Sequence, residues 1–135
     1  PRPGAAWPGG QVYLDIVSVG ATMNIMLAAA TAQGRTVLVN AAREPEISDL
    51  ADFLNGCGAR IHGAGEGTIV INGVKALSGT EHTVIPDRIT AATYMAAAAV
   101  THGHLTLRDI IPAHLGPVIP VMEELAVISA SARGI

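Results

Sequence analysis

The first half of the chain alternates between two hydrophobic periods, one typical of strands and one typical of helices. Where apolar and polar side chains alternate and β-branched residues are frequent, the pattern favours a strand. Where apolar side chains recur every three or four residues, as at Ile25, Met26 and Ala29, the pattern favours a helix. We therefore expect a strand at residues 11–17, a helix at 20–33, a strand at 36–40, and a helix that begins at Pro45 and ends within 55–58.

Short glycine-bounded segments follow, and the pattern then returns to helices. Four of these segments are expected to be short strands, at residues 60–62, 68–72, 75–78 and 82–85. Asp87 can cap a third helix, because a carboxylate accepts hydrogen bonds from the first free N–H groups of a helix. We expect this helix at 88–102, a strand at 104–109, a fourth helical stretch from Pro112 to about 126, and a last strand at 127–131.

One group of elements occurs twice along the chain. A shift of 69 residues places Gly34 on Gly103, and Pro45 falls on Pro112 once two residues are omitted. The repeated unit is a helix, a glycine, a strand, a proline-started helix and a strand, which predicts α/β layers with parallel pairing. The first copy continues into four strands and the second into at most one. We therefore expect an incomplete repeat with uncovered strand edges and apolar faces.

The composition also indicates that part of the surface of this chain is covered by other protein. Apolar residues make up 50% of the 135 residues and charged residues 14%, whereas about 25% charged residues is usual in soluble domains. A membrane is disfavoured, because the longest uncharged stretch, residues 16–34, contains polar side chains that are costly in lipid. The low share of charged residues is then explained by a large apolar face on the folded protein. Such a face predicts self-association of the chain.

Charge and residue usage exclude several classes of function. The net charge is −3, the basic residues are scattered and aromatic residues make up only 3%, so no nucleic-acid partner is expected. Cys57 is the only cysteine and follows a predicted helix, where its thiol is interpreted as structural. The five histidines lack a metal-binding pattern, so neither a metal nor another cofactor is expected. No secretion signal is visible, which favours the cytoplasm.

Two segments at the starts of predicted helices are candidate sites. Residues 18–22 join a strand to a helix, where free N–H groups and the positive helix end could bind an anion. On spacing alone, an ordinary cap by Ser18 is the preferred interpretation. At residues 86–89, Arg88 could point into a cleft beside a hinge, or Asp87 could simply cap the helix. The residues favour these two interpretations equally.

Two further segments are more simply explained by local structure. Arg43 lies among acidic residues at a helix start and could orient a substrate, although helix capping plus a local salt bridge is the preferred interpretation. The glycine-rich stretch 63–67 lies between two predicted strands, where a hairpin loop is favoured over a phosphate site. Taken without a resemblance, these residues identify no reaction.

Several linked motifs occur in one order from about Gln11 to about Leu125. Together they resemble the UDP-N-acetylglucosamine 1-carboxyvinyltransferases, a family of enolpyruvyl transferases. The segments that carry the resemblance are Ser-Val-Gly-Ala-Thr at 18–22, Asn-Ala-Ala-Arg-Glu-Pro-Glu-Ile at 40–47, Asp-Leu-Ala-Asp-Phe-Leu at 49–54, Gly-Ala-Gly at 63–65 and His-Thr-Val-Ile-Pro-Asp-Arg-Ile at 82–89.

The resemblance implies an α/β fold made of repeated βαβαββ-type units. In this family two domains each form an inside-out α/β barrel of three such units, of which this chain would contain an incomplete set. Residues 1–10 would be an irregular lead-in and residues 11–85 the last part of the first domain. Residues 86–88 would be the interdomain crossover and residues 89–135 the start of the second domain.

The resemblance also implies a reaction and a set of roles. Members transfer the enolpyruvyl group of phosphoenolpyruvate to the 3-hydroxyl of UDP-N-acetylglucosamine, the first committed step of peptidoglycan synthesis. Ser18, Val19 and Gly20 would contact the uridine nucleotide, and Asp87 and Arg88 would lie at the hinge. The segments that hold the family's catalytic Lys, Arg, Cys and Asp are expected before Pro1 or after Ile135. No catalytic residue is therefore assigned, and the chain alone is expected to be inactive.

Two other functions are weighed beside this one. The first is a non-catalytic nucleotide-binding or assembly module built from the same repeat. The second is the enolpyruvyl transferase of the shikimate pathway, which the turn at 18–20 disfavours because that enzyme has a Ser-Ser-Gln-type turn there.

The chain departs from the family pattern at a few positions. Ile16 stands where some members have a Lys near the nucleotide, and Met23 where Glu is frequent. Pro117 and Pro120 fall within a family helix, and an interior proline costs about 3 kcal/mol. That helix is therefore expected to start late or to be disordered.

Overall fold

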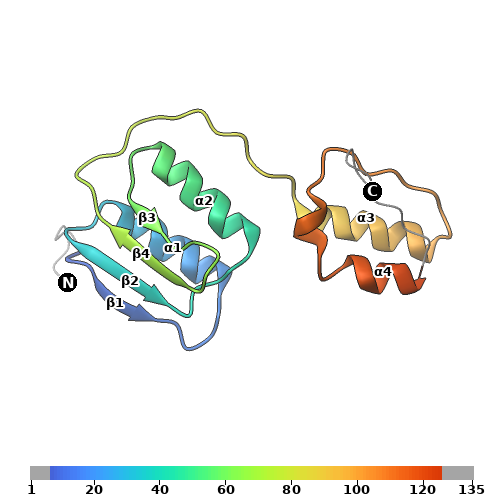
Figure 1. The fold of residues 1–135 in the computed structure, drawn as a ribbon, viewed down its shortest axis with the longest axis horizontal. Helices are drawn as coiled ribbons and strands as arrows, with labels where there is room; N and C mark the ends of the chain where they lie inside the picture. Colours follow the sequence, from blue (N-terminus) through green and yellow to red (C-terminus); the bar gives the residue numbers. More distant parts are fainter. Residues whose placement is uncertain (1–6, 126–135) are drawn as a thin grey trace. The chain divides into compact units, whose positions relative to one another are not determined.

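The computed structural model describes residues 7–125. The chain divides into two compact units between Val84 and Ile85. Each unit is described separately below, and Figure 1 gives the order of their elements.

The first unit is built on a four-stranded sheet with the order β1-β2-β4-β3. The strands are β1 (Gly10–Tyr13), β2 (Arg35–Val39), β3 (Ile61–His62) and β4 (Thr68–Asn72). β1 and β2 pair in parallel, as the repeat predicted, but β4 pairs antiparallel with both β2 and β3. The expectation of parallel pairing is thus only partly confirmed, because the tight connection from β3 to β4 reverses the chain.

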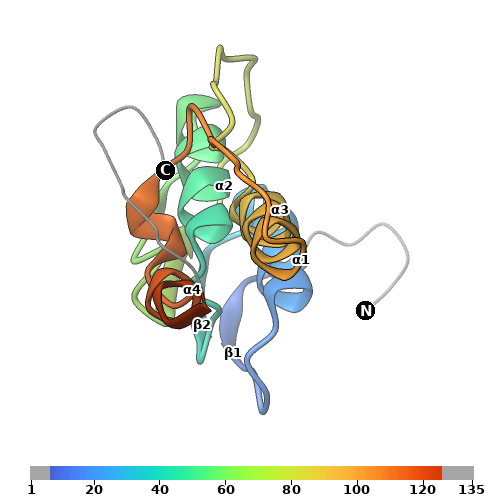
Figure 2. The same ribbon diagram turned by 90° about the vertical axis from the view of Figure 1, so that its right-hand side faces the viewer.

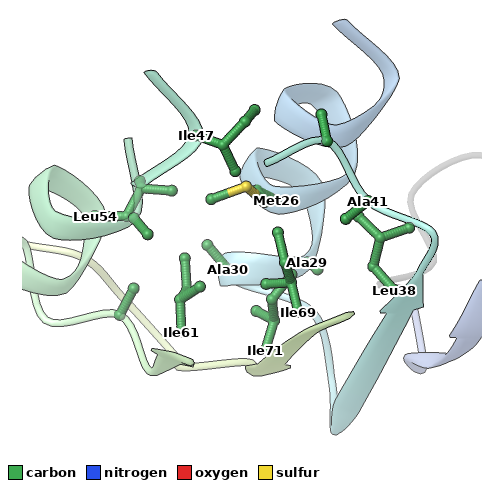
Figure 3. Packing of buried hydrophobic residues seen from close by; sticks show 13 residues of the cluster. Met26, Ala29, Ala30, Leu38, Ala41, Ile47, Leu54, Ile61, Ile69 and Ile71 are labelled. Carbon is green, nitrogen blue, oxygen red and sulfur yellow. The ribbon is translucent and has the colours of Figure 1, made fainter. Parts of the chain in front are cut away.

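Two helices, α1 (Val19–Ala30) and α2 (Pro45–Gly56), cover one face of this sheet. Leu38 of β2 is paired with Ile69 of β4, and both side chains are fully buried beneath the helices. Figure 3 shows these strand residues facing the helices' apolar side chains. The buried cluster consists of Met26, Ala29, Ala30, Leu38, Ala41, Ala42, Ile47, Ala51, Leu54, Ala59, Ile61, Ile69 and Ile71. Small alanines on α1 let the helix approach the sheet closely, and burial of the larger side chains stabilises the unit.

A glycine-rich hairpin connects β3 to β4, as the sequence predicted. Gly63, Gly65 and Gly67 all have positive φ, a conformation that side chains with a Cβ rarely adopt. The N–H of Glu66 donates to the carbonyl oxygen of Gly63 and closes the turn. Residues 63–67 therefore reverse the chain rather than bind a phosphate at a helix start.

The segment after β4 runs beside α2 without forming a strand. The N–H of Ser78 donates to the carbonyl oxygen of Cys57 at the end of α2, and His82 contacts Asp49 nearer its start. The strands expected at 75–78 and 82–85 are therefore wrong. Side-chain and backbone contacts with α2 hold this segment in place. Among the residues that the structure describes, it has no neighbouring strand with which to form a sheet.

The second unit packs helices against each other. It contains α3 (Arg88–Val100), a 3₁₀ helix η1 (Pro112–Leu115) and α4 (Ile119–Leu125). Ala91, Met95 and Leu115 form its buried centre. Pro117 precedes α4 and Pro120 is its second residue, so the expected late start of this helix is confirmed, in a position where proline's missing N–H is tolerated.

Three sequence predictions at the ends of the elements need correction or remain open. The expected strand at 104–109 is wrong, because only Arg108 forms an isolated bridge there. The first strand is shorter than expected and ends at Tyr13, since residues 15–17 have left the sheet. The strand expected at 127–131 lies outside the described residues.

Candidate functional site

The turn after β1 and the loop after β2 lie at the same end of the first unit. Because β1 and β2 are parallel, both of their carboxyl ends lie at one edge of the sheet. Each strand is followed by a helix, so the positive ends of α1 and α2 are at this edge as well. The carboxyl ends of parallel strands are where open α/β sheets generally bind ligands.

Ser18 caps α1, as the sequence predicted. Its backbone is extended, and its Oγ accepts a hydrogen bond from the N–H of Ala21 at 3.3 Å. Its carbonyl oxygen accepts a bond from the N–H of Thr22 at 3.0 Å. Within residues 7–125, the N–H groups of Val19 and Gly20 have no hydrogen-bond acceptor. These two donors remain available at the positive end of α1.

Gly20 leaves open space beside the turn. The residue is exposed, and a Cβ built on it would meet no atom within 4 Å. Packing within the unit therefore does not require glycine here, whereas close approach of a ligand to the backbone would.

The loop after β2 is hydrogen-bonded to both sides of this turn. Asn40 Nδ2 donates to the carbonyl oxygen of Leu14 at 2.7 Å. Thr22 is fully buried, and its Oγ1 accepts a bond from the N–H of Ala42 at 3.0 Å. Sequence reasoning missed both contacts, since they join residues 26 and 20 positions apart. The one signal in the sequence was Asn40 at the end of a predicted strand, because Asn tolerates the positive φ at which the backbone leaves a strand.

Arg43 makes local contacts at the start of α2. Its backbone N–H donates to Glu44 Oε2 at 2.9 Å. Its guanidinium lies over Gly67, where a Cβ would approach Nε to 2.7 Å. The hairpin glycine therefore makes room for the arginine. The backbone bond to Glu44 agrees with the local interpretation of Arg43, but the expected salt bridge of its guanidinium is absent from the ion pairs of the described residues.

Asp87 caps α3 in the second unit. Its Oδ1 accepts bonds from the N–H groups of Ile89 at 2.8 Å and Thr90 at 3.2 Å, and its Oδ2 accepts from the Thr90 hydroxyl at 2.6 Å. These bonds, the one from the Thr90 hydroxyl first, lower the pKa of Asp87 below its ordinary value of 3.8. The capping interpretation is confirmed, and the hinge interpretation remains a prediction.

Arg88, the first residue of α3, lines a groove of about 330 Å³ against the 3₁₀ helix. The other lining residues include Ile89, Ala92 and Leu115, and His114 borders the groove with a buried Nδ1 that has no hydrogen-bond partner within residues 7–125. The groove is largely apolar. Arg88 and the turn at 18–20 belong to different units.

The described residues contain neither a candidate metal-binding cluster nor a helix that could span a membrane. No group of three or more His, Cys, Asp or Glu side chains could hold a metal ion there. None of the described helices has both the length and the apolar character required to cross a membrane.

Comparison with known proteins identifies the family. The sequence pattern of the family EPSP synthase (3-phosphoshikimate 1-carboxyvinyltransferase) matches residues 6–131 of this chain. The chain belongs to the EPSP synthase family. Within this family, the chain is 56% identical over 117 residues to UDP-N-acetylglucosamine 1-carboxyvinyltransferase of Finegoldia magna. It is 59% identical over 116 residues to UDP-N-acetylglucosamine 1-carboxyvinyltransferase 2 of Caldanaerobacter subterraneus.

The matches cover most of this chain but a small part of each relative. They cover 87% and 86% of the chain, which spans 28% of the length of each of these two relatives. The family resemblance stated from the sequence motifs is thereby confirmed.

Solved structures of two enolpyruvyl transferases confirm the α/β fold. The enolpyruvyl transferase NikO from Streptomyces tendae is 26% identical and superimposes with a TM-score of 0.71, covering 86% of this chain and 29% of NikO. EPSP synthase from Acinetobacter baumannii is similar in fold, with 24% identity and a TM-score of 0.63 over 97% of this chain and 30% of that structure. The expected fold class, an incomplete set of enolpyruvyl transferase units, is confirmed.

Proposed function

We propose that this chain forms part of a UDP-N-acetylglucosamine 1-carboxyvinyltransferase and contributes its contact with the uridine nucleotide. The complete enzyme would transfer the enolpyruvyl group from phosphoenolpyruvate to the sugar 3-hydroxyl and release phosphate. Relatives at 56–59% identity carry this enzyme's name, which supports the choice of substrate over 3-phosphoshikimate. The activity would serve peptidoglycan synthesis in the cytoplasm.

The turn at Ser18, Val19 and Gly20 is the proposed nucleotide contact. The observation that carries this proposal is the pair of unoccupied N–H donors on Val19 and Gly20 at the positive end of α1. An acceptor oxygen of a uridine nucleotide is suited to such donors, and a diphosphate gains further from the helix dipole. The open space at Gly20 lets the ligand approach the backbone.

The domain assignment is proposed on the same basis. Residues 11–85 would complete one domain of the enzyme, residues 86–88 would cross between domains, and residues 89–135 would begin the other. The division of contacts between Val84 and Ile85 supports this boundary. Asp87 and Arg88 would then lie where the two domains are joined, beside a rigid Pro86.

A nuclear magnetic resonance titration of the 135-residue chain tests the nucleotide contact. We expect millimolar UDP-N-acetylglucosamine to shift the backbone amide signals of Val19 and Gly20, since weak binding is still visible in fast exchange. Shikimate 3-phosphate serves as the control ligand and should leave these signals in place. The proposed contact fails if neither amide moves at saturating concentrations of the sugar nucleotide.

Phosphate release from phosphoenolpyruvate tests the reaction. The complete protein that contains this chain should release phosphate when UDP-N-acetylglucosamine is the acceptor and not when shikimate 3-phosphate is. The reverse preference would exclude the proposed substrate. Amide shifts without any phosphate release would instead favour the non-catalytic nucleotide-binding module.

A further inference from the structure

We propose that Asn40 and Thr22 are positioning residues that hold the turn at 15–20 in a fixed shape. The inference rests on the proposed function of Ser18, Val19 and Gly20 as a nucleotide contact. It adds that the tripeptide at 40–42, in the loop that follows β2, determines the conformation in which that contact meets the ligand.

Asn40 extends the parallel pairing of β1 and β2 by one further bond. The N–H of Leu14 donates to the carbonyl oxygen of Val39 at 3.1 Å, and Asn40 Nδ2 donates to the carbonyl oxygen of Leu14 at 2.7 Å. Asn40 has φ of 60°, which turns its backbone out of the strand and brings its side-chain amide to the position of a backbone donor. The start of the turn is therefore fixed at Leu14.

Thr22 fixes the other end of the turn. Its side chain is fully buried in the first turn of α1, and its Oγ1 accepts the bond from the N–H of Ala42. The neighbouring Ala41 N–H donates to the carbonyl oxygen of Gly67 at 2.9 Å, so the tripeptide is itself tied to the hairpin. Both ends of the turn are therefore attached to one short segment.

Between these attachments the first half of the turn, residues 15–17, is held by no hydrogen bond of its own within the described part of the chain. Asp15, Ile16 and Val17 are exposed, and within residues 7–125 they make no hydrogen bond. A free loop of this kind would sample many conformations and lose that freedom on binding. Fixing both of its ends reduces this cost, and the ligand meets the two N–H donors already aligned.

Five substitutions separate the roles of side chain, backbone and charge. Asn40→Gly removes the amide and keeps a residue that accepts positive φ. Thr22→Val removes the acceptor at nearly the same volume, and Thr22→Ser retains it. Asn40→Asp replaces the donor by a carboxylate, and Asn24→Asp adds the same charge on the exposed face of α1 as its matched control.

Amide hydrogen exchange of the chain is the first readout. Loss of one hydrogen bond predicts about three- to tenfold faster exchange at Leu14, Ala21 and Thr22 in Asn40→Gly and Thr22→Val. Exchange at Ile71, in the central strand pairing, should change far less. Thr22→Ser and Asn24→Asp should exchange like the parent chain. Unchanged exchange at the turn, or equal acceleration at Ile71, overturns the proposal.

Affinity for UDP-N-acetylglucosamine, measured by the amide shifts of Val19 and Gly20, is the second readout. We expect about three- to tenfold weaker binding in Asn40→Gly and Thr22→Val and normal binding in Thr22→Ser. Faster exchange with unchanged affinity would show a structural role only and would overturn the positioning role. If the parent chain does not bind UDP-N-acetylglucosamine, the proposed function fails, and so does the role of Asn40 and Thr22 in nucleotide binding. The exchange data then still decide whether residues 40–42 hold the turn.

Discussion

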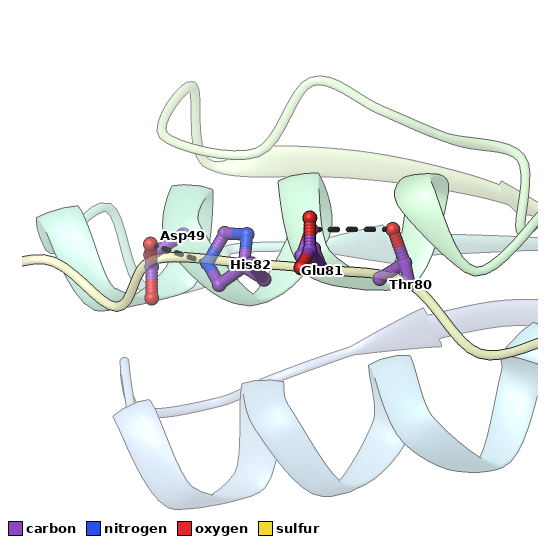
Figure 4. A network of polar contacts seen from close by, with 4 residues as sticks. All are labelled: Asp49, Thr80, Glu81 and His82. Carbon is purple, nitrogen blue, oxygen red and sulfur yellow. Dashed lines mark hydrogen bonds and ion pairs between the residues drawn. The ribbon is translucent and has the colours of Figure 1, made fainter.

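His82 Nε2 lies 2.9 Å from Asp49 Oδ1 and joins the segment after β4 to α2 across 33 residues of sequence. The same imidazole contacts the Phe53 ring in an edge-on arrangement, with ring centroids 5.6 Å apart. Figure 4 shows the segment running along the helix at this point. Because Asp49 and Phe53 are four residues apart, both lie on the face of α2 that the segment covers.

We expect the His82–Asp49 contact to stabilise the first unit. Both side chains are largely shielded from solvent, with 20% and 16% exposed, so a coupling free energy of about 1 kcal/mol is expected. A double-mutant cycle with His82→Ala and Asp49→Ala, followed by urea unfolding, measures this coupling. The exposed Glu81→Ala variant is the control and should change stability little. Additive effects of the two substitutions would show that the contact contributes nothing.

Asp87 should make the start of α3 sensitive to acid. Its pKa is lower in the folded chain than its ordinary value of 3.8, because the folded state donates hydrogen bonds to the carboxylate. Its contribution is therefore fully present above the unfolded-state value and is lost as pH falls through the folded-state value. The amide signals of Ile89 and Thr90 should titrate with a midpoint below 3.8.

Asp87→Asn is the control for this titration. Asparagine still offers a capping oxygen but does not ionise in this range. Its Ile89 and Thr90 amide signals should lose the acid transition. A midpoint at or above 3.8 in the parent chain would contradict the assigned hydrogen bonds.

Gly73 is required where two backbone segments meet. A Cβ on Gly73 would overlap the carbonyl oxygen of Ala32, and the N–H of Gly73 already donates to Gly34 at 2.8 Å. Gly73→Ala should therefore destabilise the first unit by about 1–3 kcal/mol, as overpacking does. Gly79→Ala is the matched control, because a Cβ there meets nothing within 4 Å. Equal unfolding midpoints for the two variants would refute the close approach.

Self-association of the chain remains a prediction from its composition. In the first unit the apolar side chains of Ile16 and Leu27 are 80% and 51% exposed, and contact with a second copy would remove this apolar surface from water. Light scattering coupled to size exclusion should show dimers or larger species that increase with concentration. The Ile16→Ser, Leu27→Glu double variant should shift the distribution towards monomer, and Gln33→Glu should not. A monomer at every concentration would disprove the prediction.

Local signals predicted the helices and the caps well. Ser18 and Asp87 stand 69 residues apart, the spacing of the repeat, and each accepts a hydrogen bond from the first turn of its own helix. Met26 and Met95, related by the same shift, are both buried. Such features depend on residues within one turn of each other, so a single sequence contains the information needed to predict them.

Strands were predicted less well, for a physical reason. The segments 68–72 and 75–78 are both short runs that lie between glycines, but only the first has neighbours on both sides in the sheet. A strand exists only where a partner offers its backbone, and the pattern of one segment does not contain that partner. The contact between His82 and Asp49 was unforeseen for the same reason.

The sequence by itself determined the helices that begin at Pro45 and Arg88, the start of α1 to within one residue, the glycine turn at 63–67 and, through linked motifs, the family resemblance. The tertiary structure decided the sheet order, the loss of three expected strands and the attachment of the turn at 15–20 to residues 40–42. Helices and caps are made by bonds between neighbours in the chain. Sheet order and the shape of an exposed turn depend on which distant backbone groups meet once the core has packed.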